Sequence, residues 1–198
     1  IIKSVFEKND LKKLFNKYEN MINDKRLKNK SHSAIAPLDI EDRHKWIHNL
    51  SNKNIIKICT DYLGSNVVTF ANQINHLFED EWKHESMQPH IDSRCNDLKI
   101  YIWISDYTEN CHPLYYLKGS HKKFKFWLSY DDTRNTNIEK SEMEKIYGNV
   151  GDVIIFDTNG WHSHYKEKNT PRTVLDMCIA PNNIFFGTTK KGKNILKI

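Results

Sequence analysis

The chain has 198 residues, which is long enough to bury most of its apolar surface in one core, and we therefore expect a single domain. Hydrophobic residues make up 38% and aromatic residues 12%, a composition that excludes a disordered chain. The net charge of +5 arises from 30 lysines and arginines against 25 aspartates and glutamates. The basic residues are spread along the chain, so we expect them on solvated faces and expect no nucleic-acid partner.

The cysteines and the hydropathy pattern predict a cytoplasmic protein. Cys59, Cys95, Cys111 and Cys178 lie far apart and form no Cys-x-x-Cys pair, so neither a zinc knuckle nor a disulfide framework is expected. No apolar run approaches the ~18 residues that a membrane span needs, and no signal-peptide pattern is present. We therefore expect no membrane association; the oligomeric state is not predicted by the sequence.

Residues 1–65 are expected to be mostly helical. From Leu11 onward, apolar residues recur at the spacing of an amphipathic helix. Ser51 and Gly64 are suited to cap the last helix of this part at its two ends. The expected helices span 5–24, 42–50 and 52–63, with a loop over 25–38.

From Val67 the hydrophobic period changes from helical to alternating, and glycine, proline and asparagine separate short β-branched and aromatic runs. The expected strands span 67–76, 87–93, 98–106, 113–118, 124–129, 152–157, 161–165 and 172–180, with a short helix or turn over 139–147. Helices followed by many short strands predict a mainly β fold with flanking helices. We expect a double-stranded β-helix (a cupin-like jelly roll) over 66–181, followed by a tail over 182–198.

The strand over 98–106 separates two kinds of side chain. Leu98, Ile100 and Ile102 share one face, whereas Tyr101 and Trp103 share the other. The isoleucines suit a helix-facing surface. The two aromatic residues are therefore expected in the interior of the roll, as a wall for a bound organic ligand.

Two short patterns indicate a metal site. His90 and Asp92 form a His-x-Asp pair, whose side chains point the same way on an extended strand and supply two of the three ligands of a two-histidine, one-carboxylate Fe(II) site. Further along the chain, His162 and His164 share a strand face, so either one is a candidate for the third ligand. Ten positions after His162 stands Arg172, and a planar guanidinium can bind the far carboxylate of a dicarboxylate cosubstrate through two hydrogen bonds.

Taken in order, several elements resemble the phytanoyl-CoA dioxygenase family of Fe(II)/2-oxoglutarate oxygenases. They are His90-x-Asp92, then Gly119-Ser120-His121, then Gly151-Asp152, His162 and Arg172. The resemblance covers about residues 54–181. Lys118 departs from it, because the family usually has proline at that position.

The resemblance implies the roles of six residues. The implied iron ligands are His90, Asp92 and His162. Arg172 would bind the distal carboxylate of 2-oxoglutarate, and Trp103 would line the cosubstrate pocket. Asn72 falls where the family places another cosubstrate contact.

The resemblance also implies Fe(II) as cofactor, 2-oxoglutarate as cosubstrate, O2 as co-reactant, and release of succinate and CO2. Asp92 favours hydroxylation, because halogenating relatives have a small residue in place of this carboxylate. Short loops favour a small-molecule substrate. The segments 79–88 and 129–149 would border the mouth of the site, with Trp82, Arg94, Tyr101, Arg134 and Trp161 as candidate substrate contacts.

Two alternatives remain open at this point. A cupin-like metal protein, such as an isomerase that does not use 2-oxoglutarate, would share the roll and the histidines but would not need Arg172. A non-catalytic ligand-binding roll would produce no succinate under any condition.

Overall fold

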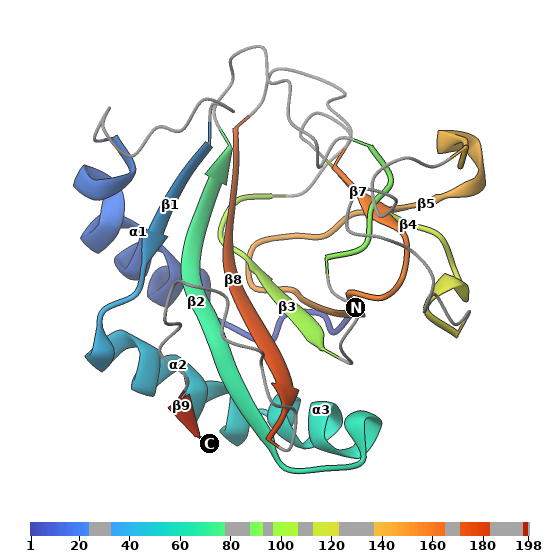
Figure 1. The fold of residues 1–198 in the computed structure, drawn as a ribbon. Helices are drawn as coiled ribbons and strands as arrows, with labels where there is room; N and C mark the ends of the chain where they lie inside the picture. The colour runs from blue at the N-terminus through green and yellow to red at the C-terminus, as the bar shows by residue number, and fades with distance from the viewer. Residues whose placement is uncertain are drawn as a thin grey trace, which may run out of the picture.

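A computed structural model describes residues 1–23, 33–77, 88–92, 97–106, 113–122, 137–164, 171–182 and 196–197. Two antiparallel sheets face each other, and three helices lie against the outer face of the larger one (Figure 1). The expectation of a mainly β fold with flanking helices is thereby confirmed.

The larger sheet has the strand order β1-β2-β8-β3-β6, and β9 also pairs with β2. Its strands are β1 (Ser33–Pro37), β2 (Val67–Leu77), β3 (Leu98–Trp103), β6 (Val153–Asp157), β8 (Arg172–Pro181) and β9 (Leu196–Lys197). The smaller sheet has the order β5-β4-β7, with β4 at Leu114–Tyr116, β5 at Glu144–Ile146 and β7 at His162–Ser163. An antiparallel bridge between His90 and His162 extends the smaller sheet by one position.

The three helices are α1 (Lys8–Asn23), α2 (Ile40–Asn52) and α3 (Ile55–Leu63). Asp39 caps α2 by accepting a hydrogen bond from the backbone nitrogen of Asp42 at 2.8 Å. Gly64 ends α3 in the left-handed conformation (φ 66°), as expected. Among the described helices, none combines the length and the apolarity that crossing a membrane requires.

Three local expectations differ from the structure. Ser51 lies inside α2, and α3 instead follows Asn54, which has a positive φ of 59° and caps no backbone group with its side chain. The predicted loop over 25–38 contains β1, which forms because its backbone pairs along the edge of β2 from Ser33 to Pro37. The segment 139–147 contains the strand β5 after a short 3-10 turn, because β4 pairs with it.

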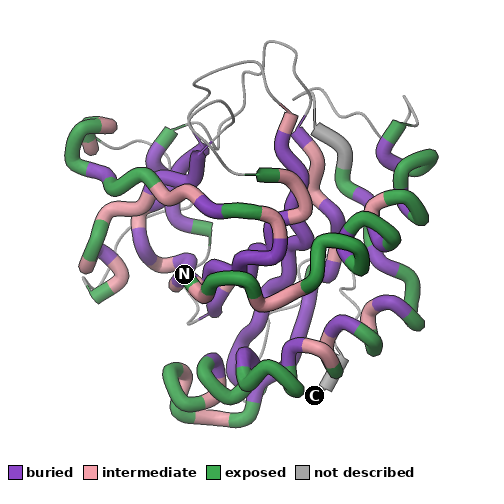
Figure 2. The backbone as a smooth tube through the Cα atoms, turned by 180° about the vertical axis from the view of Figure 1, so that it is seen from behind, coloured by how far each residue is buried: buried purple, intermediate pink, exposed green. Residues whose placement is uncertain are grey.

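Side chains of β3 contribute to two separate cores. Leu98, Ile100 and Ile102 pack with the helices, whereas Tyr101 and Trp103 pack between the sheets with residues of β6 and β8. Seen from behind in Figure 2, the buried strands run behind helices whose outward surfaces are exposed. The alternation predicted for β3 is therefore confirmed, and it decides which side chains face the interior of the roll.

Some predictions cannot be compared with the structure. The strand over 124–129 and the candidate contacts Trp82, Arg94 and Arg134 lie outside the described residues. Of the predicted strand over 87–93, residues 88–92 are described, and they contribute the bridge at His90.

Candidate metal centre

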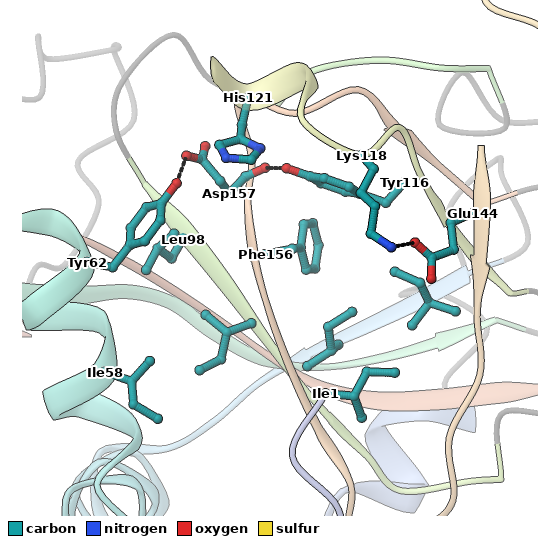
Figure 3. Close-up of a pocket in the computed structure, with 13 residues that line it drawn as sticks. Ile1, Ile58, Tyr62, Leu98, Tyr116, Lys118, His121, Glu144, Phe156 and Asp157 are labelled. Carbon is teal, nitrogen blue, oxygen red and sulfur yellow. Dashed lines mark hydrogen bonds and ion pairs between the residues drawn. The ribbon is translucent and has the colours of Figure 1, made fainter. Parts of the chain in front are cut away.

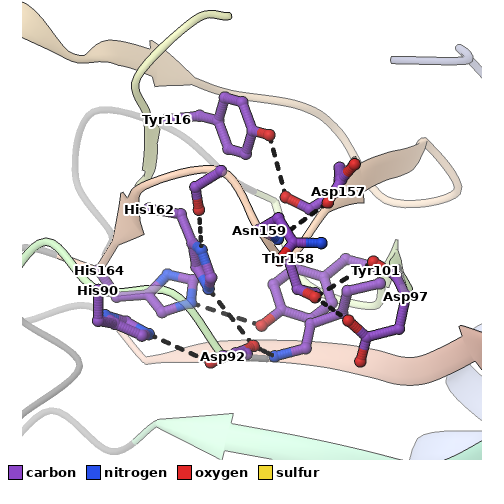
Figure 4. Close-up of polar contacts among 12 residues, drawn as sticks. His90, Asp92, Asp97, Tyr101, Tyr116, Asp157, Thr158, Asn159, His162 and His164 are labelled. Atoms are coloured by element: carbon purple, nitrogen blue, oxygen red, sulfur yellow. Dashed lines mark hydrogen bonds and ion pairs between the residues drawn. The ribbon is translucent and has the colours of Figure 1, made fainter. Parts of the chain in front are cut away.

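The side chains of His90, Asp92 and His162 converge in the structure (Figure 4). One nitrogen each of His90 and His162 and one oxygen of Asp92 all lie within 4.8 Å of one another. The Nε2 atoms of the two histidines lie 3.4 Å from the two carboxylate oxygens of Asp92. Ligand atoms that bind one divalent metal at about 2.1 Å and at right angles are ~3 Å apart, so the group needs little rearrangement to hold such an ion.

The backbone brings these three residues together from distant parts of the chain. The amide and carbonyl groups of His90 and His162 are hydrogen-bonded to each other, with both distances 2.9 Å. The amide of Asp92 donates to the carbonyl of Thr158 at 3.2 Å, in the turn before β7. The His-x-Asp segment is thus held directly against the turn that carries the second histidine.

The second nitrogen of each imidazole determines its tautomer. Nδ1 of His90 lies 2.8 Å from the carbonyl oxygen of Gln88, and Nδ1 of His162 lies 2.9 Å from that of Gly160. Since a carbonyl can only accept, each Nδ1 carries the hydrogen and donates it. Each Nε2 therefore presents a lone pair toward Asp92, which is the arrangement that a metal-binding histidine needs.

The charges around the cluster favour the ligating forms. Burial holds the pKa of His162 below its usual value, so the imidazole stays neutral. Desolvation would raise the pKa of Asp92, but the charge of the Lys99 ammonium outweighs it and holds this pKa well below the usual range. Lys99 contacts Asp92 directly through its Nζ atom, and the lysine side chain is only 15% exposed.

His164 does not join the cluster. Its Nδ1 lies 2.8 Å from Nη1 of Arg172 and accepts a hydrogen bond from it, while its Nε2 lies 3.4 Å from the hydroxyl of Tyr101. Burial, together with the charge of Arg172, holds the pKa of His164 well below its usual value. Among the described residues, the metal-binding geometry is formed by His162 and not by His164.

Arg172 and Trp103 both lie inside the roll. Arg172 is 1% exposed at the start of β8, and Trp103 on the neighbouring β3 has no exposed surface. Trp103 pairs with Val174, two positions after Arg172, so both side chains are on the interior face of the sheet. A planar guanidinium on this face can bind a carboxylate through two hydrogen bonds.

Asn72 is placed differently from the other predicted cosubstrate contacts. A bulge in β2, where Ala71 has φ 51°, shifts the register between Phe70 and Gln73. The amide of Asn72 lies 3.4 Å from the hydroxyl of Thr69, whose partner on β8 belongs to the helix-facing core. The structure thus brings Asn72 to the helix side of the sheet, away from Tyr101 and Trp103.

Two interior residues near the cluster did not stand out in the sequence. Lys99 contacts Asp92. It is two positions from Tyr101, so alternation along β3 places both side chains on the interior face. Asp176 is 4% exposed on β8 and pairs with Tyr101. Both are charged residues, and charged residues in a strand usually face solvent. In the sequence, only their spacing from neighbouring aromatic residues indicates an interior position.

A separate pocket of about 430 Å³ lies at the edge of β6 (Figure 3). Isoleucines supply most of its apolar lining, and Phe156 stands at its centre. On one side the Tyr62 hydroxyl donates to Asp157 at 2.8 Å, and on the other Lys118 and Glu144 of the smaller sheet form an ion pair at 2.9 Å. Phe156 also contacts His162 edge to face, with ring centroids 5.3 Å apart, and so separates this pocket from the metal-binding cluster.

A scan of protein-family models finds no match for the chain, and a search of curated proteins finds none. Several solved structures are similar to it. The epimerase SnoN in complex with Fe3+, alpha ketoglutarate and nogalamycin RO has a TM-score of 0.69 at 14% identity, covering 95% of this chain and 85% of SnoN. HygX from Streptomyces hygroscopicus, with nickel, 2-oxoglutarate and hygromycin B bound, has a TM-score of 0.64 at 15% identity, covering 92% and 82%. EvdO2 from Micromonospora carbonacea var. aurantiaca has a TM-score of 0.64 at 12% identity, covering 89% and 83%.

At these identities the likeness is evidence of fold. Two of the three proteins were solved with a metal ion and 2-oxoglutarate bound, and they share the two-sheet arrangement over most of this chain. The cupin-like jelly roll expected from the strand pattern is therefore confirmed.

Proposed function

We propose that the protein is an Fe(II)- and 2-oxoglutarate-dependent oxygenase whose iron is held by His90, Asp92 and His162. The observation that carries the proposal is the convergence of two deprotonated Nε2 atoms and one carboxylate within 4.8 Å. Two imidazoles and a carboxylate on one face of an ion leave its other positions open for cosubstrate and O2.

Arg172 is proposed to bind the distal carboxylate of 2-oxoglutarate. It is a buried guanidinium on the interior face, and His164 accepts a hydrogen bond from its Nη1, which restricts its orientation. The complexes of SnoN and HygX contain 2-oxoglutarate in the same fold, which supports a cosubstrate of this kind. Trp103 and Tyr101 would exclude water from the space between the metal and Arg172.

Iron(II) together with a 2-oxo acid supplies O2-dependent oxidation of a C–H bond, with release of succinate and CO2. The chain contributes the orientation of the reactants, because the backbone carbonyls of Gln88 and Gly160 fix the two imidazoles. Asp92 occupies the position of the carboxylate ligand, which favours hydroxylation as the outcome.

The substrate is proposed to be a small molecule. SnoN was crystallised with nogalamycin RO and HygX with hygromycin B, and the present chain covers 85% and 82% of those proteins. This likeness of fold supports a small molecule as the substrate of the present chain.

Three measurements test the proposal. Anaerobic addition of Fe(II) and then 2-oxoglutarate should produce a visible charge-transfer band in the wild-type protein, and a metabolite screen should identify compounds that stimulate succinate release. His162→Ala should abolish the band and succinate release, whereas His121→Ala, a histidine outside the cluster, should preserve both. An Fe(II) protein with no band on addition of 2-oxoglutarate would instead support the metal protein that does not use this cosubstrate.

The mass of the product identifies the reaction. Hydroxylation adds one oxygen atom to the substrate, whereas epimerisation, the activity in the name of SnoN, leaves its mass unchanged. A product of unchanged mass, formed only with 2-oxoglutarate present, would preserve the oxygenase-type cofactor requirement and overturn the assignment as a hydroxylase.

A further inference from the structure

Lys99 occupies a position that is unusual for a lysine. Its side chain extends from β3 into the interior of the roll, is 15% exposed, and places Nζ in contact with Oδ2 of Asp92. The same oxygen lies 3.4 Å from Nε2 of His162. An ammonium group thus sits on one of the oxygens that the proposed function assigns to a metal ion.

A divalent cation and this ammonium would compete for the same carboxylate. Two positive charges a few ångströms apart repel each other, and the repulsion is strong in a poorly solvated interior. Once Asp92 binds a metal, Lys99 would be left as a buried charge without an adequate counter-charge. Such a charge is costly unless another acceptor is within reach.

The structure contains a second acceptor at a suitable position. Lys99 pairs with Cys178 across β3 and β8, and Tyr101 pairs with Asp176, so Lys99 and Asp176 are diagonal neighbours on one face of the sheet. A long side chain can span this diagonal. Asp176 is 4% exposed, and its Oδ1 is buried without a hydrogen-bond partner.

The electrostatics of the two residues agree with this placement. Burial raises the pKa of Asp176 to about 6, and the charge of Lys99 is the largest influence that opposes the rise. The charges of Asp92 and Asp176 both favour the protonated form of Lys99. The ammonium therefore interacts with both carboxylates while it contacts only Asp92.

We propose that Lys99 is a positioning residue with two partners, pairing with Asp92 when the metal site is empty and with the orphaned oxygen of Asp176 when a divalent cation binds Asp92. The inference rests on the proposed function only for the assignment of Asp92 as a ligand. Asp176 thereby lowers the electrostatic cost of metal binding, because it receives the ammonium that the metal displaces.

A double-mutant cycle measures this exchange of partners. Ni2+ affinity is determined by calorimetry at pH 7.5 for the wild-type protein, Asp176→Asn, Lys99→Met and the double variant. In the protein with the native Lys99, Asp176→Asn should raise the Kd for Ni2+ about tenfold. In the Lys99→Met protein, the same substitution should raise this Kd about twofold or less. Glu144→Gln, which breaks an exposed ion pair with Lys118 in the smaller sheet, is the matched control and should leave the Kd unchanged.

The cycle distinguishes a partner exchange from a static role. If Lys99 stays on Asp92 after metal binding, its interaction with Asp176 is the same in the metal-free and the metal-bound protein. Asp176→Asn will then change the Kd for Ni2+ by factors that agree within about twofold with Lys99 present and with Lys99→Met. That result would overturn the inference. The Ni2+-loaded crystal structure provides a measurement that needs no variant. Nζ within 4 Å of Asp176 supports the exchange, and Nζ still in contact with Asp92 refutes it.

The proposed function can fail separately. If His162→Ala binds Ni2+ as tightly as the wild-type protein, the metal assignment itself is wrong. If His162→Ala abolishes binding but the cycle shows no coupling, the metal assignment stands and only the role of Lys99 is wrong. Thermal unfolding of each variant confirms that the compared proteins are folded.

Discussion

Asp97→Asn should stabilise the protein at neutral and alkaline pH. Asp97 is 5% exposed at the start of β3, and its carboxylate accepts a hydrogen bond from the hydroxyl of Thr158. Thr158 in turn accepts the backbone hydrogen bond of Asp92, so Asp97 supports the turn that holds the metal-binding cluster. Burial raises the pKa of Asp97 to about 6 from its ordinary 3.8, with the hydroxyl of Thr158 opposing the shift.

The sign and the size of the effect follow from linkage. A carboxyl group whose pKa is higher in the folded state binds more protons there, so stability falls as pH rises from 3.8 toward 6. With these two pKa values, ionisation of Asp97 costs about 2 kcal/mol of folding free energy at pH 5 and about 3 kcal/mol at pH 8. Asparagine keeps the acceptor oxygen for Thr158 and never ionises, so it should recover these amounts as upper limits.

Urea unfolding of the wild-type protein and Asp97→Asn at pH 5 and pH 8 measures the difference directly. The variant should be more stable at both values, with a gap that grows by about 1 kcal/mol between them. Asp61→Asn is the control, because Asp61 forms an exposed ion pair with Lys57, and its stability should change by less than about 0.5 kcal/mol at either pH. A variant that is no more stable than the wild type at pH 8, or a gap that does not widen with pH, would refute the reasoning.

Three further substitutions test the site and its surroundings. Arg172→Lys should raise the 2-oxoglutarate concentration for half-maximal succinate release at least about tenfold, because an ammonium cannot bind a carboxylate through a planar pair of hydrogen bonds; an unchanged requirement would exclude Arg172 as the carboxylate ligand. His164→Ala should leave the Kd for Ni2+ within about twofold of the wild type while His162→Ala abolishes binding, and calorimetry that found the reverse would exchange their roles. Gly148→Ala should lower the free energy of unfolding by at least about 2 kcal/mol, because an added Cβ would lie 1.3 Å from the buried ring of Trp103; a near-neutral result in urea would show that the ring can move.

The parts of the fold that were predicted from the sequence depend on local alternation. The apolar and aromatic faces of β3 could be separated because each residue of a strand points opposite to its neighbour, and the two cores contain those residues as expected. His90 and Asp92 could be paired for the same reason. That His162 reaches them across 70 residues could not be derived from alternation, and came from the resemblance in the order of motifs.

The parts that were missed depend on contacts between distant segments. The strand β1 ends in a proline and has no alternating pattern, and it is a strand because the edge of β2 offers it hydrogen bonds. The ion pair between Lys99 and Asp92 was missed for a related reason. A lysine in a strand is ordinarily assigned to solvent, and only the closed roll places this one against a carboxylate from another segment.

The bulge in β2 explains why Asn72 does not reach the interior. Counting by twos from Phe70, which packs with the interior residue Cys178, would place Asn72 and Ile74 on the interior face. Ala71 inserts an extra residue, so Gln73 pairs with Asp176 and Ile74 turns to the helix-facing core. Asn72 was assigned by matching a position of the family to this strand. Such a match ignores the inserted residue and therefore selects a side chain on the helix-facing side of the sheet. The side chain that the register brings next to Asp176 is Gln73, and the interior on this side of the roll is therefore lined by a glutamine and an acid that no motif in the sequence indicated.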